Sequence, residues 1–401
     1  MKMIPAHAPP HNKHELVKSL AMLVRKRETV KDIFEDKVKN LLQTDKYLTL
    51  SSGRRALYIA LKSLGIGKGD EVILPAFTTD IVPMVVREAG AVPVPADVKL
   101  DDYNIDVDSV IEHITDRTKA ILTVHTFGYP SDVKALREIC EDHDLFLIED
   151  AAPAFGAKYE GRPVGTFGDF GIISFGVGKS ISMGTGGGLI VSDEKMFEGI
   201  KERIVPKEFK SSVKIFVKIS GSILLSNPYL YGVIGCKVKD GIVSHQYDNY
   251  KEEILDGGDI SLLSYAIGIQ EIERRVFKRR REIALEYTDI LRKFDDVYPP
   301  VEKRNIYPVY TRYFIRVKTE DMRNNICERM RKSGIEPLIP DHGYPISENL
   351  YPSKYQDDIP NARMLSETLI GIPVHRKITK DRLAKIFNGD VDEKGDTYTP
   401  R

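Results

Sequence analysis

The sequence predicts an α/β protein with a mainly parallel central sheet covered by helices and a smaller C-terminal α+β domain. Short apolar runs alternate with segments of helical periodicity through the first half of the chain, a pattern typical of strand–helix–strand units. The chain has 401 residues, more than one hydrophobic core usually holds. A second domain is therefore expected.

Composition places the chain among ordinary globular proteins. Its 59 Lys and Arg residues balance 59 Asp and Glu residues, so the net charge does not favour a nucleic-acid partner. Three widely spaced cysteines, Cys140, Cys236 and Cys327, fit neither a disulfide framework nor a zinc site, and no metal is expected. The N-terminus lacks the apolar segment of a secretory signal. A cytoplasmic location follows from these features as an expectation.

The first elements are predicted to be helices followed by a strand and a turn. Apolar residues recur at helical spacing among charged ones between residues 14 and 42, which favours one or two surface helices. Residues 47–52 are predicted to form a strand and turn, and residues 55–64 a helix that ends at Gly65.

Strands and helices then alternate. The predicted strands are 71–74, 92–95, 120–124 and 145–149, and the predicted helices are 81–89, 106–114 and 132–141. Ligands of parallel sheets bind beyond the carboxyl ends of the strands. Asp150, which directly follows the last of these strands, is therefore a candidate site residue.

A glycine-rich segment carries a second candidate, Lys179. Residues 165–192 read GTFGDFGIISFGVGKSISMGTGGGLIVS, and the apolar runs 171–175 and 188–191 are predicted strands on either side of a tight loop. Lys179 lies in that loop, where burial should lower the pKa of its amine.

The rest of the chain is predicted to hold the smaller domain. Its predicted elements are a long helical stretch at 261–291, a strand at 307–317 and helices at 321–333 and 380–387. The predicted division is a helical segment at 1–45, a large domain at 46–285 with an apolar insertion at about 205–256, and a small domain at 286–401.

The candidate residues supply the three kinds of group that pyridoxal 5'-phosphate (PLP) chemistry requires. This cofactor needs an amine for a Schiff base, an acid beside its pyridine nitrogen and donors for its phosphate. Lys179 would supply the amine and then act as general acid and base, and Asp150 would keep the pyridine nitrogen protonated. Ser174, five residues before Lys179, is within reach of the phosphate.

Further phosphate donors are expected at the turn Ser52-Gly53-Arg54. This turn precedes a predicted helix, whose first N–H groups and dipole attract anions, and Arg54 or Arg55 could add a charge. Singly, each candidate also has a structural explanation, since an Asp after a strand often caps a helix and a lysine in a glycine loop is usually solvated. The combination is more specific than its parts.

Longer strings resemble the DegT/DnrJ/EryC1/StrS family of PLP-dependent sugar aminotransferases. The matching strings are GIGKGDEVILPAFT (65–78), HTFGYPSD (125–132), LIEDAAPAFGAKYEGRPVGTFGDFGIISF (147–175), GTGGGLIVSDE (184–194) and GIPVHRKIT (371–379). The resemblance implies a fold-type I enzyme, a homodimer with active sites at the subunit interface, and amino transfer, commonly from glutamate, to a nucleotide-linked keto-sugar in glycan or polysaccharide biosynthesis.

The resemblance also assigns roles by position. Asp150 matches the partner of the pyridine nitrogen, Ser174 a phosphate ligand and Lys179 the Schiff-base lysine. Gly53 and Arg54 fall where the family has its phosphate-binding Gly-Thr.

Four positions depart from the family pattern. Pro153 replaces a glutamine that contacts the cofactor, Thr79 replaces a bulky residue, and Gly257 and Asp259 replace an Asn and an Arg through which the partner subunit reaches the phosphate. The cation of Arg54 could compensate. A PLP-dependent sugar dehydratase or lyase, and a catalytically degenerate member with a structural or regulatory role, therefore stay open as alternatives.

Three other features allow more than one interpretation. The apolar segment 213–235 is too interrupted to span a bilayer, so a buried or dimer-contact insertion is favoured over a weak membrane-surface contact. The basic run RRVFKRRR (274–281) is predicted to be a solvated helix face, not a nucleic-acid site. His125 could face the pocket or belong to the core.

Overall fold

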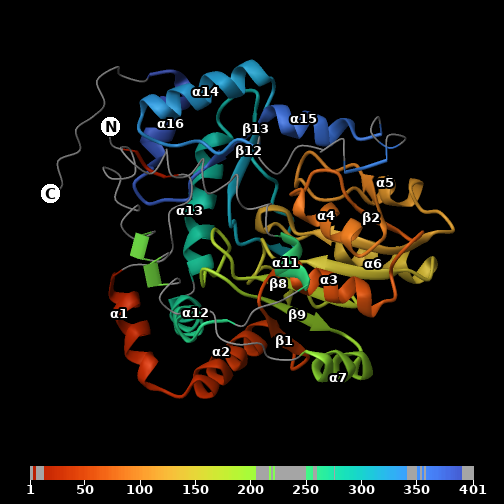
Figure 1. Cartoon of the computed structure of the whole chain (residues 1–401). Helices are drawn as coiled ribbons and strands as arrows, with labels where there is room; N and C mark the ends of the chain where they lie inside the picture. The colour runs from red at the N-terminus through yellow and green to blue at the C-terminus, as the bar shows by residue number, and fades with distance from the viewer. Residues whose placement is uncertain are drawn as a thin grey trace.

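A seven-stranded sheet forms the centre of the computed structural model, which describes residues 3–5, 13–204, 216–217, 220–221, 250–255, 260–274, 276–340, 350–352, 355 and 358–390 (Figure 1). Its strands, in spatial order, are β1 (Tyr47–Leu50), β9 (Gly187–Val191), β8 (Phe170–Ser174), β5 (Phe146–Asp150), β4 (Thr118–Val124), β2 (Glu71–Pro75) and β3 (Val92–Ala96). From β8 to β3 neighbouring strands run parallel, and only β9 runs against both of its neighbours. The predicted α/β class with a mainly parallel sheet is confirmed.

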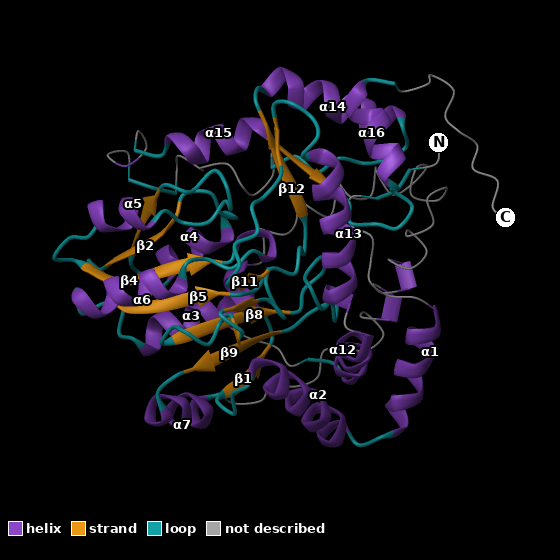
Figure 2. Ribbon diagram, turned by 180° about the vertical axis from the view of Figure 1, so that it is seen from behind, coloured by secondary structure: helices purple, strands orange, loops and turns teal. Residues whose placement is uncertain are grey.

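Helices cover both faces of this sheet (Figure 2). Successive side chains of a strand point to opposite faces. In β2, Val72 and Leu74 pack with α3 (Gly53–Ser63), α4 (Ile81–Glu88) and α7 (Glu194–Arg203), whereas Ile73 packs with α5 (Val107–Glu112) and α6 (Val133–Asp142). Because both faces are buried, these strands are almost entirely apolar.

The N-terminal helices pack beside the large sheet. They are α1 (Lys13–Ala21), η1 (Met22–Val24) and α2 (Arg27–Leu42), and the first two contact α12 (Leu262–Arg274) through leucine side chains. Phe34 of α2 makes an edge-to-face contact with Phe175, the ring centroids 5.3 Å apart. This contact supports the base of the loop that follows β8.

A smaller sheet lies above the large one in Figure 1. Its strands are β10 (Val297–Tyr298), β12 (Tyr313–Val317) and β13 (Leu369–Ile372), accompanied by α13 (Val276–Leu291), α14 (Glu320–Lys332), α15 (Pro360–Thr368) and α16 (Lys380–Asn388). Phe314 stacks on Phe127 of the large domain with a 4.0 Å centroid separation. The predicted boundary near residue 286 falls within α13, so the division into domains stays a prediction.

A third small sheet connects these parts. It pairs β6 (Lys158–Tyr159) with β7 (Arg162–Pro163) and with β11 (Ile306–Tyr307). The predicted strand 307–317 was wrong in its continuity, because Tyr310 has a φ of 46°, which breaks the extended chain between β11 and β12. The predicted helical stretch 261–291 is two helices, α12 and α13.

Some predictions lie outside the described residues. They concern Gly257 and Asp259, most of the apolar insertion at 205–256 and the membrane-contact alternative at 213–235. Within the part of the chain that is described, no helix is long and apolar enough to cross a membrane.

Candidate active site

The carboxyl edge of the sheet brings the predicted site residues together. Gly187 of β9 pairs with Ser174 on one side and with Leu50 on the other. Since β9 runs against both neighbours, β1 and β8 are parallel and end at the same edge. The turn after β1 enters α3 at Ser52, so the start of this helix lies beside the end of β8 although about 120 residues separate them in sequence.

Close contact between Gly53 and Ser174 forms one wall of the site. A Cβ atom on Gly53 would lie 3.1 Å from the Ser174 Cβ and 3.3 Å from the Ile173 carbonyl oxygen. Ser52 caps α3, its Oγ accepting a hydrogen bond from the Arg55 N–H at 3.2 Å. The first N–H groups of a helix have no acceptor within it, and together with the helix dipole they suit a phosphate.

Replacing Gly53 by Ala should weaken PLP binding, because the new methyl group would push the start of α3 away from Ser174. We expect the dissociation constant for PLP to rise by roughly 10-fold, about the effect of one lost hydrogen bond to a charged group. Equilibrium dialysis of the cofactor-free protein measures it. The matched control is Gly199→Ala in α7, where an added Cβ meets no atom within 4 Å; a variant at Gly53 that binds like this control would contradict the prediction.

Asp150, which is buried, and Lys179, which is half-buried, act on each other's charge. Asp150 ends β5, is 9% exposed and accepts a hydrogen bond from the Ala152 N–H at 2.9 Å. Burial raises the pKa of Asp150, while the charge of Lys179 lowers it. Burial likewise lowers the pKa of Lys179, as predicted, while Asp150 opposes that shift. Each residue thus stabilises the charged form of the other where water does so poorly.

Two arginines add positive charge to this pair. Arg312 and Arg54 both lower the pKa of Lys179 further. The sequence offered two arginines at the start of α3. The guanidinium of Arg55 donates hydrogen bonds to the carbonyl oxygens of Ile254 at 3.3 Å and Leu255 at 3.1 Å, away from Lys179. Arg54 is therefore the one that acts on the site.

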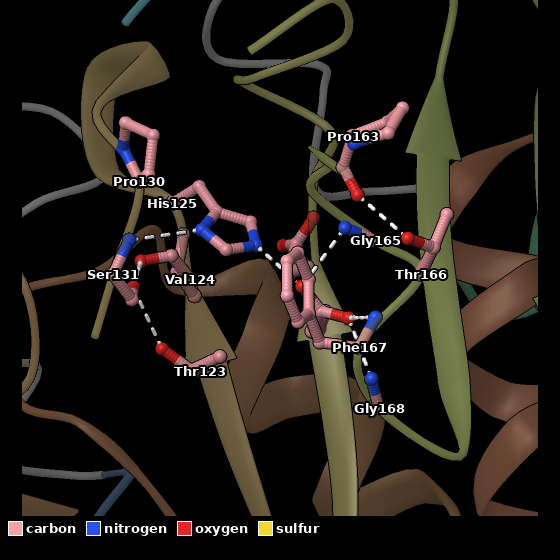
Figure 3. Close-up of polar contacts among 12 residues, drawn as sticks. Thr123, Val124, His125, Pro130, Ser131, Pro163, Gly165, Thr166, Phe167 and Gly168 are labelled. Carbon is pink, nitrogen blue, oxygen red and sulfur yellow. Dashed lines mark hydrogen bonds and ion pairs between the residues drawn. The ribbon is translucent and has the colours of Figure 1, made fainter. Parts of the chain in front are cut away.

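His125 is fully buried and belongs to a network of polar contacts (Figure 3). Its Nδ1 accepts the Ser131 N–H at 3.0 Å, so Nε2 carries the hydrogen and donates it to Glu149 Oε2 at 3.1 Å. The fully buried Glu149 carboxylate also accepts three backbone N–H groups at 2.6–2.8 Å, those of Gly165, Phe167 and Gly168. This network fixes the end of β5, and with it the adjacent Asp150.

The Lys179 loop is fastened by residues that the sequence did not single out. Ser180 and Thr311 share a hydrogen bond of 2.6 Å between their hydroxyl oxygens, and Thr311 also donates to the carbonyl oxygen of Pro153. Arg280 donates to the Lys179 carbonyl oxygen at 3.4 Å. No local motif marks Thr311 or Arg280, which lie more than 100 residues further along the chain.

The basic run at 274–281 is not wholly a solvated face, and that prediction was wrong for its last two residues. Besides the contact of Arg280, Arg281 forms an ion pair of 2.5 Å with Glu302 and lies over the ring of Tyr307 at 4.6 Å. Helix α13 turns these two side chains toward neighbouring segments.

Within the part of the chain that is described, no group of three His, Cys, Asp or Glu side chains gathers as a metal site would require. A cavity lined by Gln43, Lys46 and Ser192 lies at the opposite edge of the sheet, because β9 runs antiparallel and ends there. Thr79, which replaces a bulky residue of the family, is half-buried.

Known proteins resemble this chain along most of its length. Residues 24–389 match the model of the DegT/DnrJ/EryC1/StrS aminotransferase family. GDP-perosamine synthase of Escherichia coli O157:H7 is 29% identical over 360 residues, which cover 88% of this chain and 87% of that protein. The dTDP-3-amino-3,4,6-trideoxy-alpha-D-glucose transaminase of Streptomyces venezuelae is 40% identical over 169 residues, 42% of this chain and 45% of that one.

The fold is also that of solved structures. An aminotransferase from Streptoalloteichus hindustanus superposes with a TM-score of 0.74 at 23% identity, covering 97% of this chain and 98% of the other. At this level of identity the likeness concerns the fold alone.

Proposed function

Because the chain belongs to the DegT/DnrJ/EryC1/StrS aminotransferase family, whose members are PLP-dependent sugar aminotransferases, we propose that it moves the amino group of glutamate to a nucleotide-linked keto-sugar that feeds glycan or polysaccharide synthesis. The observation that carries the proposal is the charge coupling of buried Asp150 with half-buried Lys179, beside the contact between Gly53 and Ser174. GDP-perosamine synthase and the dTDP-aminosugar transaminase support nucleotide sugars as the substrate class.

The residues present fit PLP. Gly53 has no Cβ, which lets the start of α3 with its N–H groups lie close to Ser174 and its hydroxyl. We propose that Ser52, Gly53, Arg54 and Ser174 hold the phosphate, that Asp150 pairs with the pyridine nitrogen and that Lys179 holds the cofactor covalently. When bound, PLP withdraws electrons from the carbon that carries the transferred amine.

The protein's own contribution is to hold and move protons. Burial raises the pKa of Asp150, and a neighbouring cation lowers it. A protonated pyridine nitrogen would be such a cation when Lys179 is neutral. The lowered pKa of Lys179 gives its Nζ a neutral form nearer to physiological pH, as a general base requires.

Absorption spectroscopy tests the proposal. Purified protein loaded with PLP should absorb visible light, and borohydride followed by peptide mass spectrometry should find the cofactor on Lys179. L-glutamate should convert the cofactor to its pyridoxamine form, and GDP- or dTDP-linked keto-sugars should regenerate it with release of an amino sugar. A protein that binds PLP but releases ammonia or water from the sugar would be a lyase or dehydratase, and one that does not bind PLP would be a degenerate member.

Replacing Arg54 by Met should weaken PLP binding and raise the pKa of Lys179. The dissociation constant for PLP should rise about 10- to 100-fold, the usual effect of losing a charged hydrogen bond to phosphate. The guanidinium lowers the pKa of Lys179, so without it the ammonium form persists to higher pH. Acylation of Lys179 in the cofactor-free protein, followed by mass spectrometry against pH, should therefore reach half its maximal rate at a higher pH.

Arg55→Met is the control for this prediction. It removes the neighbouring guanidinium, which contacts the carbonyl oxygens of α11 (Tyr250–Leu255). It should leave the acylation midpoint unchanged. If PLP affinity in Arg54→Met equals that of wild type, Arg54 does not compensate for the family's missing phosphate contacts.

The assembly and location belong to the same proposal. We expect a homodimer, because Val177, two residues from Lys179, is 57% exposed and a partner subunit would cover its apolar side chain. Light scattering of the holoprotein measures the oligomeric state. The free thiols of Cys140 and Cys327 fit the reducing conditions of a cytoplasm.

A further inference from the structure

A half-buried arginine with no assigned role lies beside the Lys179 loop. Arg312 precedes β12 of the small sheet, and its N–H donates to the carbonyl oxygen of Phe127 at 3.5 Å. Its neighbour Thr311 shares a 2.6 Å hydrogen bond with Ser180, the residue next to Lys179. Contacts on two sides therefore fix the backbone of Arg312 next to the loop that carries the reactive lysine.

The guanidinium of Arg312 differs from those of other arginines in this part of the fold. Arg281 pairs with Glu302, Arg316 lies over Tyr298 at 4.0 Å, and Arg323 pairs with Glu320. Among the residues described, none forms a hydrogen bond or ion pair with the side chain of Arg312, whose charge acts instead on Lys179. A half-buried guanidinium without a carboxylate partner favours an anionic ligand.

The charges of the site leave room for such an anion. Arg54 and Arg312 are the cations that act on Lys179, and Asp150 is the carboxylate that acts on it. Arg54 stands at the start of α3, where the cofactor phosphate is proposed to bind. Arg312 approaches from the small sheet instead, so it is placed to bind a different anion from the cofactor phosphate.

We propose that Arg312 binds the α-carboxylate of the amino-acid donor. The inference rests on the proposed transaminase function. In an amino acid the carboxylate is attached to the same carbon as the reacting amine, so its binding group must lie close to Lys179. In a nucleotide sugar the phosphates are separated from the reacting carbon by the sugar ring. A guanidinium also binds a carboxylate through two parallel hydrogen bonds, which orients the donor.

The test compares donors with the cofactor in place. PLP-loaded wild type, Arg312→Gln and Arg312→Lys are mixed with L-glutamate, L-glutamine, L-alanine or L-aspartate, and the rate of the visible absorbance change is followed against amino-acid concentration. For Arg312→Gln we expect the half-saturating concentration to rise about 10- to 100-fold for whichever of these reacts with wild type. The half-saturating concentration for Arg312→Lys should lie between those of wild type and Arg312→Gln. Lysine keeps the positive charge but cannot form the two parallel hydrogen bonds of a guanidinium.

Two control measurements distinguish a loss of donor binding from a loss of cofactor binding or of structure. The dissociation constant for PLP should stay within about twofold of wild type, since Arg312 is not assigned to the phosphate. Arg316→Gln, on the same segment but over Tyr298, should keep the wild-type dependence on amino acid. The assays are run at a pH where the wild-type rate no longer changes with pH, so that a shift in the pKa of Lys179 does not alter them.

The outcomes separate a failure of the Arg312 assignment from a failure of the proposed function. An Arg312→Gln protein that saturates at wild-type donor concentrations overturns the assignment, as does a parallel loss of PLP affinity, which would place Arg312 on the cofactor. A wild type that responds to none of the four amino acids overturns the proposed function, and the assignment falls with it. A wild type that responds while Arg312→Gln responds equally removes only the assignment.

Discussion

Lys179→Ala should abolish covalent attachment of the cofactor and reduce amino transfer by roughly 10³-fold or more, because one side chain supplies both the covalent anchor and the proton transfers. The observation behind this expectation is a lysine whose pKa is lowered by burial and by two arginines, beside a buried carboxylate. Borohydride reduction and peptide mass spectrometry should find no cofactor on residues 175–186 of the variant.

Two further variants make this result specific. Lys179→Arg keeps the positive charge but cannot form the covalent bond at accessible pH, so it should be as inactive as Lys179→Ala. Lys201→Ala removes an exposed lysine of α7 whose ion pair is with Glu198, and it should keep wild-type activity. Retention of a reducible cofactor linkage in Lys179→Ala would show that another lysine is the anchor.

Asp150→Asn should lower kcat by about 10²- to 10³-fold, the usual effect of removing one preorganised electrostatic group from an active site. The substitution preserves shape, and the asparagine oxygen can still accept the Ala152 N–H at 2.9 Å. It removes the negative charge that would keep the pyridine nitrogen protonated. Steady-state kinetics with L-glutamate measure the loss.

The effect of Asp150→Asn on the free energy of unfolding should be opposite in sign to its effect on kcat. Burial raises the folded-state pKa of Asp150 above its ordinary value of 3.8. The stability that its protonated form contributes is therefore complete below that ordinary value and is lost as pH rises through the raised folded-state pKa. Asparagine stays neutral, so in cofactor-free Lys179→Ala protein, where no ammonium is left for Asp150 to stabilise, Asp150→Asn should raise the melting temperature at neutral pH.

Asp193→Asn provides a matched control. Asp193 caps α7, where its side chain accepts the Met196 N–H at 2.7 Å, and asparagine caps helices equally well. It should change neither kcat nor the melting temperature. A large loss of stability in Asp150→Asn, with kcat unchanged, would assign Asp150 a structural role instead.

Local sequence was sufficient for the elements that position the candidate lysine and carboxylate. The strands around Asp150 and Lys179 are short apolar runs bounded by glycine or charged residues, and burial on both faces requires that pattern. The turn at Ser52 and Gly53 carries a helix-capping signal that is legible without the fold. The two alternatives for His125 could not be separated in the same way, because a histidine after a strand has no local signature of its partners.

What the sequence alone determined, therefore, was the α/β class, the order of Asp150, Ser174 and Lys179, and the family resemblance. Only the tertiary structure decided that Gly53 lies against Ser174, that Arg54 rather than Arg55 acts on Lys179, and that Arg312 reaches the same loop. The physical reason is that hydrophobic periodicity and capping depend on neighbours within a few residues, whereas charge coupling and close packing depend on distances in space. Chain topology, which joins residue 312 to residue 179 through Thr311 and Ser180, sets those distances.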